Sequence, residues 1–117
     1  MSSLPGCFDW PAQYAGDTAP WQQFSLKLGG APIDLTGATV SMQVRKRGNL
    51  PPIIDLSSAG GTGILITDAA GGVFRIGGFL NPNTNIVARY DIQVTFPSGD
   101  IRTFLSGSYE IHQQVTQ

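Results

Sequence analysis

Few side chains in this sequence offer the chemistry that catalysis or metal binding requires. His112 is the single histidine, and the alternation of apolar residues before it places its side chain on the outward face of a strand. A zinc site or a Ser-His-Asp triad needs further groups at defined positions, and the sequence indicates none for His112. We therefore expect His112 to be a polar surface residue without a catalytic role.

The carboxylates are similarly scattered. Asp91 and Glu110 are the pair that could act together, because a glycosidase needs two carboxyl groups roughly 5–10 Å apart. Such a pair forms only if the strands bring their outer faces together, and Asp91 itself is expected to point outward. The sequence also lacks a D-x-D-x-D-G calcium loop. We expect no enzyme activity, no cofactor, no metal and no small-molecule substrate.

One basic run and one glycine-rich segment could bind phosphate. Arg45-Lys46-Arg47 could contact a phosphate or an acidic partner, but it is better interpreted as a solvated strand end before the Gly48-Asn49 turn. The GGTG segment at 60–63 lacks the Gly-Lys-Ser/Thr of a phosphate-binding loop and precedes an expected strand. We interpret it as a turn.

Composition excludes several classes of partner. The formal charge of −1 gives no long-range field to attract nucleic acid or an anionic membrane. Residues 1–20 do not have the pattern of a signal peptide, and no apolar run approaches the ~20 residues that cross a bilayer. The lone Cys7 excludes an internal disulfide framework. Only 13% of residues are charged, so the surface is neutral and polar, which favours coverage by other proteins.

The elements that carry these residues are predicted to be strands. Short segments with period-two alternation lie between closely spaced glycines and prolines, which is typical of half-buried antiparallel strands. The expected strands are 21–28, 38–46, 52–56, 63–67, 73–79, 86–96, 101–105 and 108–116. This pattern predicts an all-β fold, an immunoglobulin-like or jelly-roll β-sandwich of seven to eight antiparallel strands.

Alternation also predicts the core and the turns. The inward sets are Phe24, Leu26 and Leu28; Val40, Met42 and Val44; Tyr90, Ile92, Val94 and Phe96; and Tyr109, Ile111 and Val115. The PSGD segment after Phe96 predicts a hairpin between strands 86–96 and 101–105. Thr36-Gly37 predicts a tight turn in which the glycine takes a positive φ.

The first 20 residues differ from the rest, because their prolines, glycines and aromatics follow no period. We expect residues 1–20 to form an extended N-terminal arm and residues 21–117 to form the β-sandwich domain. The arm either folds back over a sheet edge or extends onto a neighbouring subunit. Large aromatics are common at interface centres, so the expected interface residues are Phe8, Trp10, Tyr14 and Trp21.

Several segments together resemble small virion proteins of tailed bacteriophages. These segments are Gly16-Asp17-Thr18, PIDLTGATVSMQVRK at 32–46, the string YDIQV at 90–94, and Ser98-Gly99, Thr103, Gly107 and Val115-Thr116 near the end. Their order and spacing are similar to those of the N-terminal β-sandwich domain of phage baseplate upper proteins, which joins receptor-binding parts to the tail. The resemblance implies a structural protein without catalytic residues.

The resemblance also sets the expected function. A baseplate upper protein continues into a coiled coil and further domains, whereas this chain reaches Gln117 directly after the last expected strand, so we expect a free-standing subunit. The expected partners are copies of the same chain and other virion proteins in the tail, at a fibre or at a baseplate attachment point. The particle would be assembled in the host cytoplasm. A capsid decoration protein is the alternative, and a small carbohydrate-binding module is a third.

Overall fold

The computed structural model describes residues 6–46, 50–60 and 63–112, and these residues form strands and turns with no helix. The all-β prediction is therefore confirmed. The strands are β1 (Gly6–Cys7), β2 (Gln13–Tyr14), β3 (Gln22–Ser25), β4 (Lys27–Leu28), β5 (Ala31–Pro32), β6 (Thr39–Arg45), β7 (Ile54–Ser57), β8 (Ile64–Asp68), β9 (Val73–Ile76), β10 (Ile86–Thr95) and β11 (Ile101–His112).

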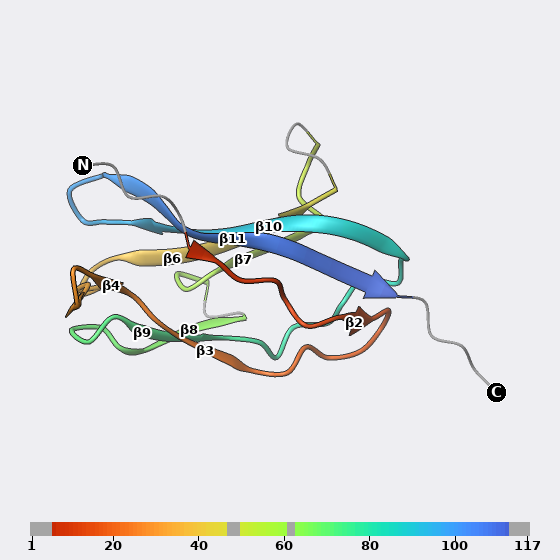
Figure 1. Cartoon of the computed structure of the whole chain (residues 1–117), viewed down its shortest axis with the longest axis horizontal. Helices are drawn as coiled ribbons and strands as arrows, with labels where there is room; N and C mark the ends of the chain where they lie inside the picture. Colours follow the sequence, from red (N-terminus) through yellow and green to blue (C-terminus); the bar gives the residue numbers. More distant parts are fainter. Residues whose placement is uncertain (1–5, 47–49, 61–62, 113–117) are drawn as a thin grey trace.

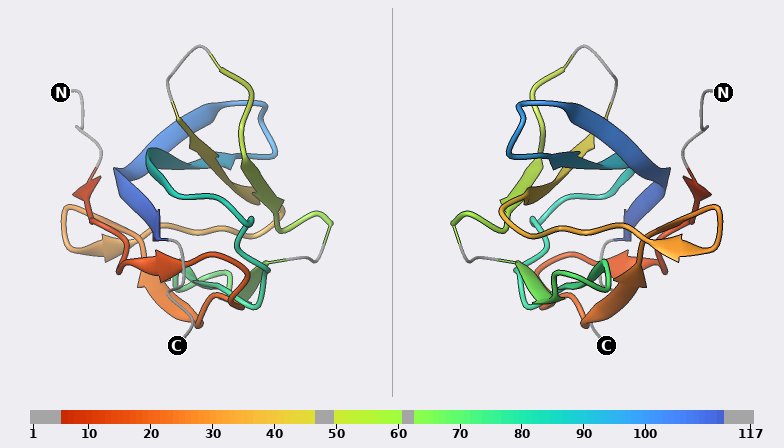
Figure 2. Two further views of the ribbon diagram at one scale, coloured as in Figure 1. Left: turned by 90° about the vertical axis from the view of Figure 1, so that its right-hand side faces the viewer. Right: turned by 90° about the vertical axis from the view of Figure 1, so that its left-hand side faces the viewer.

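The larger sheet has six strands in the order β1-β11-β10-β6-β7, with β2 also paired to β11. The pairs among β11, β10, β6 and β7 are antiparallel, whereas β1 and β2 run parallel to β11. The smaller sheet has the order β3-β9-β8, and β4 pairs with β5 in a short hairpin. Figure 1 shows the two sheets as separate layers, and the end views of Figure 2 show the larger sheet curving over the smaller one.

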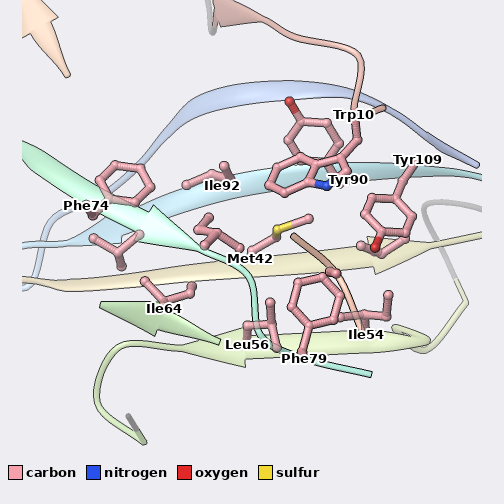
Figure 3. Packing of buried hydrophobic residues seen from close by; sticks show 14 of the residues in the cluster. Trp10, Met42, Ile54, Leu56, Ile64, Phe74, Phe79, Tyr90, Ile92 and Tyr109 are labelled. Atoms are coloured by element: carbon pink, nitrogen blue, oxygen red, sulfur yellow. The ribbon is translucent and has the colours of Figure 1, made fainter. Parts of the chain in front are cut away.

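The hydrophobic core fills the space between these layers (Figure 3), because alternate side chains of each strand point inward. Most of the predicted inward residues are buried, and the fully buried ones are Val40, Met42, Val44, Ile92, Val94, Tyr109 and Ile111. The smaller sheet contributes Ile64, Phe74 and Ile76 from the opposite side. Phe24 and Phe96 are partly buried, and Leu28 is exposed at 56%, because β3 ends at Ser25 and Leu28 belongs to the β4–β5 hairpin. Val115 lies outside the described residues.

The turns predicted at PSGD and at Thr36-Gly37 are confirmed, whereas Gly61 and Thr62 of the GGTG segment lie outside the described residues. The amide of Phe96 donates to the carbonyl oxygen of Asp100 at 2.8 Å, and Gly99 has a φ of 96°, which closes the hairpin between β10 and β11. Gly37 has a φ of 76° in the turn before β6.

The last strand, β11, is longer than the sequence predicted. We expected separate strands at 101–105 and 108–116, but β11 runs without a break from Ile101 to His112. The pairing of β10 with β11 shifts register between Ile92 and Gln93, and this shift accounts for the irregular alternation of apolar residues along β11. Gly107 does not end the strand. It lies where the arm approaches, and a Cβ there would overlap the carbonyl oxygen of Phe8.

The described part of the N-terminal segment, residues 6–20, folds back onto the edge of the sheet of its own chain. Its amides at Phe8 and Trp10 donate to the carbonyl oxygens of Ser106 and Ser108 at 3.1 and 2.9 Å, and the strands β1 and β2 continue the same edge. Three residues before position 20, namely Trp10, Ala15 and Ala19, belong to the core. The boundary expected at residue 20 is therefore not a boundary of the core.

A buried polar network holds this segment in place. Asn81 is 1% exposed, and its Nδ2 donates to Gln13 Oε1 at 3.2 Å and to the carbonyl oxygen of Asp17 at 3.0 Å. The hydroxyl of Tyr109 donates to Asn81 Oδ1, and burial raises the pKa of this tyrosine far above its ordinary value, so the hydroxyl remains a donor. Gln13 Nε2 donates in turn to the carbonyl oxygen of Pro11 at 2.8 Å. A network satisfied in this way specifies one position for the segment.

Candidate functional site

Two of the four predicted interface residues lie inside the molecule. Trp10 is 4% exposed, and its ring centroid lies 5.3 Å from that of Tyr90 and 5.8 Å from that of Tyr109 (Figure 3). Phe8 is partly buried and contacts Trp10 and Phe24 edge to face. The ring of Trp10 therefore packs in the core of its own chain, and the role of Trp10 at an interface stays a prediction.

The other two predicted interface residues are exposed, but in different parts of the fold. Tyr14 is 50% exposed on β2, and its ring centroid lies 6.2 Å from that of His112. Trp21 is 42% exposed just before β3, and the Arg75 guanidinium lies 5.3 Å from its ring centroid. A Cβ at Gly78 would lie 2.7 Å from Trp21 Cζ2, so this glycine lets the ring lie against the chain. The four predicted residues therefore do not form one surface.

The candidate catalytic groups do not converge in the described structure. His112 points outward as predicted, and its Nε2 lies 3.1 Å from Glu110 Oε1 with both side chains partly exposed. Asp91 is opposite Ser106 of β11, and Glu110 lies four residues beyond Ser106 on that strand. The Cα atoms of Asp91 and Glu110 are therefore about 13 Å apart along the strand direction. Among the residues described, no group of three or more His, Cys, Asp and Glu side chains could hold a metal ion.

The outer face of the six-stranded sheet carries a shallow depression lined by several charged side chains. This depression, with a volume of about 300 Å³, spans β6, β10 and β11. It is lined mainly by Gln43, Arg45, Lys46, Arg89, Asp91 and Ser106. These side chains meet because β6 and β10 are adjacent and alternation turns their odd-numbered residues outward.

Charge is concentrated in this depression. Arg45 and Arg89 are directly opposite each other on β6 and β10. Arg45 Nη1 donates to the carbonyl oxygen of Leu50 at 3.1 Å, and its Nη2 donates to Gln43 Oε1. Burial raises the pKa of the nearby Asp91, and the charge of Arg45 offsets part of that rise.

Arg45 and Lys46 belong to the basic run that the sequence indicates as a solvated strand end, whereas Arg89 belongs to no motif of the sequence. Alternation around Tyr90 predicts that Arg89 points outward. Its position opposite Arg45 could not be predicted, because it depends on the pairing of two strands far apart in the chain. Arg47, Gly48 and Asn49 lie outside the described residues.

Comparison with known proteins gives no assignment. No protein-family model matches this chain, and no curated protein is significantly similar to it. Within the described residues, no helix is long and apolar enough to cross a membrane.

Proposed function

We propose that this protein is a structural subunit of a tailed-phage virion that assembles through protein–protein contacts in the tail or at a fibre or baseplate attachment point. The observation that carries the proposal is the resemblance of residues 16–46 and 90–116 to the N-terminal domain of phage baseplate upper proteins. Two of the matching segments can be placed in the described part of the fold. The Gly16-Asp17-Thr18 segment follows β2 and accepts a hydrogen bond from Asn81, and the segment 32–46 leads into β6.

The scaffold of this subunit would be a β-sandwich of the immunoglobulin-like or jelly-roll kind. The two facing sheets and the core between them support this proposal. A rigid double layer of this kind acts by presenting fixed surfaces to its neighbours. The N-terminal segment does not serve as a free arm in this proposal, because its described residues pair with β11 of the same chain.

The contacts would use neutral polar faces and a few exposed aromatic side chains. Tyr14 and Trp21 remain the candidate anchors, since both keep large exposed areas and tyrosine and tryptophan are frequent at interface centres. The low charge of the chain, 13% of residues, supports contact over a wide area because few charges would lose water on assembly.

The experiment is quantitative mass spectrometry of purified particles made by the genome that encodes this chain, after separation of heads from tails. We expect the chain in the tail fraction at about six to a few dozen copies, as ring symmetry requires. Roughly hundreds of copies in the head fraction would favour the capsid decoration protein instead. Absence of the chain from washed particles would contradict both assignments.

A carbohydrate-binding module is the remaining alternative. It would need an aromatic ring with one face open for stacking, and Arg75 lies over the ring of Trp21. Saccharide-dependent quenching of tryptophan fluorescence that disappears in Trp21→Phe would favour this function over the structural one. Unchanged fluorescence across cell-wall sugars would exclude Trp21 as a stacking platform.

A further inference from the structure

The depression on the outer face of the larger sheet brings three cationic side chains together. In an antiparallel pair, directly opposite residues have Cβ atoms about 4.5–5.5 Å apart, and like charges at such positions are destabilising. Arg45 and Arg89 are such a pair, and Lys46 follows Arg45 at the end of β6. An anion placed between them would remove this repulsion.

The described part of the chain places only one carboxylate beside these three cationic side chains. Asp91 lies in the depression near Arg45, two residues from Arg89 along β10. The sole ion pair within residues 6–46, 50–60 and 63–112 joins His112 and Glu110, so neither Arg89 nor Lys46 has a carboxylate partner there. Three cations against one carboxylate leave a local positive charge.

One of the three cationic side chains, that of Arg45, is held in position by hydrogen bonds. Arg45 is fixed by Leu50 and Gln43, yet a guanidinium has five N–H groups, so it keeps donors for a ligand. Two arginines on directly opposite strand positions suit a carboxylate, which accepts parallel hydrogen bonds from a guanidinium. The formal charge of the whole chain is −1, so the attraction is local and does not favour a long polyanion such as nucleic acid.

We propose that this depression is a docking site for an acidic side chain, aspartate or glutamate, of a neighbouring protein. Arg89 and Lys46 bind the carboxylate, Arg45 orients it, and Asp91 limits the site to a single negative group. The inference rests on the proposed function in one respect, namely that the carboxylate belongs to a protein in the same assembly.

The test is an NMR titration of the full chain with a short peptide that carries two glutamates between glycines, with its glutamine counterpart and inorganic phosphate as further probes. We expect the glutamate peptide to shift the amide resonances of residues 43–46 and 89–91, and the glutamine peptide to leave them unchanged. Arg89→Gln and Lys46→Gln should each weaken binding about fivefold. Arg102→Gln is the matched control, because Arg102 is exposed at the opposite end of the β10–β11 ladder.

Three outcomes would overturn the inference. Absence of shifts at residues 43–46 and 89–91 would show that no carboxylate binds there. An equal loss of binding in Arg102→Gln would show that only overall charge matters. Tighter binding of phosphate than of the peptide would assign the site to a different ligand.

A failure of the proposed carboxylate site can be distinguished from a failure of the proposed virion role, because the titration uses the isolated protein and the particle analysis uses the virion. Binding by a chain that is absent from particles would remove the proposed virion role and retain the carboxylate site. A chain found in particles that does not bind the peptide would retain the virion role and remove the site.

Discussion

The hydroxyl of Tyr90 donates a hydrogen bond to the main-chain carbonyl oxygen of Phe8. This bond joins a central strand of the larger sheet to the N-terminal segment. The same carbonyl group lies over Gly107, and the ring of Trp10 packs on the ring of Tyr90. The segment is therefore fixed by hydrogen bonding, close backbone approach and aromatic packing at one place.

Tyr90→Phe tests the hydrogen bond alone, because it keeps the ring. We expect the free energy of unfolding to fall by about 1–2 kcal/mol, since the Phe8 carbonyl group loses a partner in a partly buried position. Tyr14→Phe makes the same chemical change at a half-exposed ring and should alter stability by less than about 0.5 kcal/mol. Denaturant unfolding measures both, and equal effects in the two variants would contradict this role for Tyr90.

Gly107→Ala tests the close approach of the N-terminal segment. The added Cβ would lie 2.8 Å from the carbonyl carbon of Phe8, so the segment must move away from β11. We expect a loss of about 1–3 kcal/mol and faster hydrogen exchange at the amides of Phe8 and Trp10. Gly60→Ala is the control, because the nearest atom to its Cβ would be 3.8 Å away. Unchanged exchange at Phe8 and Trp10 in Gly107→Ala would refute the argument.

Local patterns predicted the strands that form the core. Alternation in 38–46 and 86–96 gave the buried faces of β6 and β10, and the PSGD segment gave the hairpin, because these features depend on neighbouring residues. The all-β class follows from the same signals.

Features that depend on distant parts of the chain could not be predicted in this way. A glycine such as Gly107 is typical of a break between strands. Only the position of Phe8 explains why a glycine is needed inside β11. Trp10 could not be assigned to core or interface from a segment without periodicity. The pairing of Arg45 with Arg89 likewise depends on the register between β6 and β10.

Asn81→Ala tests the buried polar network. Removing this amide leaves the Tyr109 hydroxyl and Gln13 Oε1 without their partner in the core, so we expect the free energy of unfolding to fall by about 2–3 kcal/mol. Asn85→Ala changes an exposed asparagine in the same connection and should have little effect. Thermal and denaturant unfolding both report the difference, and similar midpoints for the two variants would count against a structural role for the network.

Asp91 predicts a pH dependence with an unusual sign for a carboxylate. Burial raises the pKa of Asp91 above its ordinary value of 3.8, and the charge of Arg45 offsets only part of that rise. The folded chain therefore holds this proton more tightly than the unfolded chain, and the contribution of Asp91 to stability falls as pH rises from 3.8 through the folded-state pKa. We expect Asp91→Asn to be more stable than wild type at pH 7, with the difference shrinking toward about pH 4.

Asp34 supplies a comparison of opposite sign. Hydrogen bonds from the Thr36 hydroxyl and amide lower the pKa of Asp34, so its contribution is present above its ordinary value of 3.8 and is lost as pH falls through the folded-state pKa. Asp34→Asn should therefore be less stable than wild type at pH 7. Denaturant unfolding of the three proteins between about pH 4 and pH 7 checks both signs. Destabilisation by Asp91→Asn at pH 7 would mean that the attraction of Arg45 outweighs the cost of burying the carboxylate.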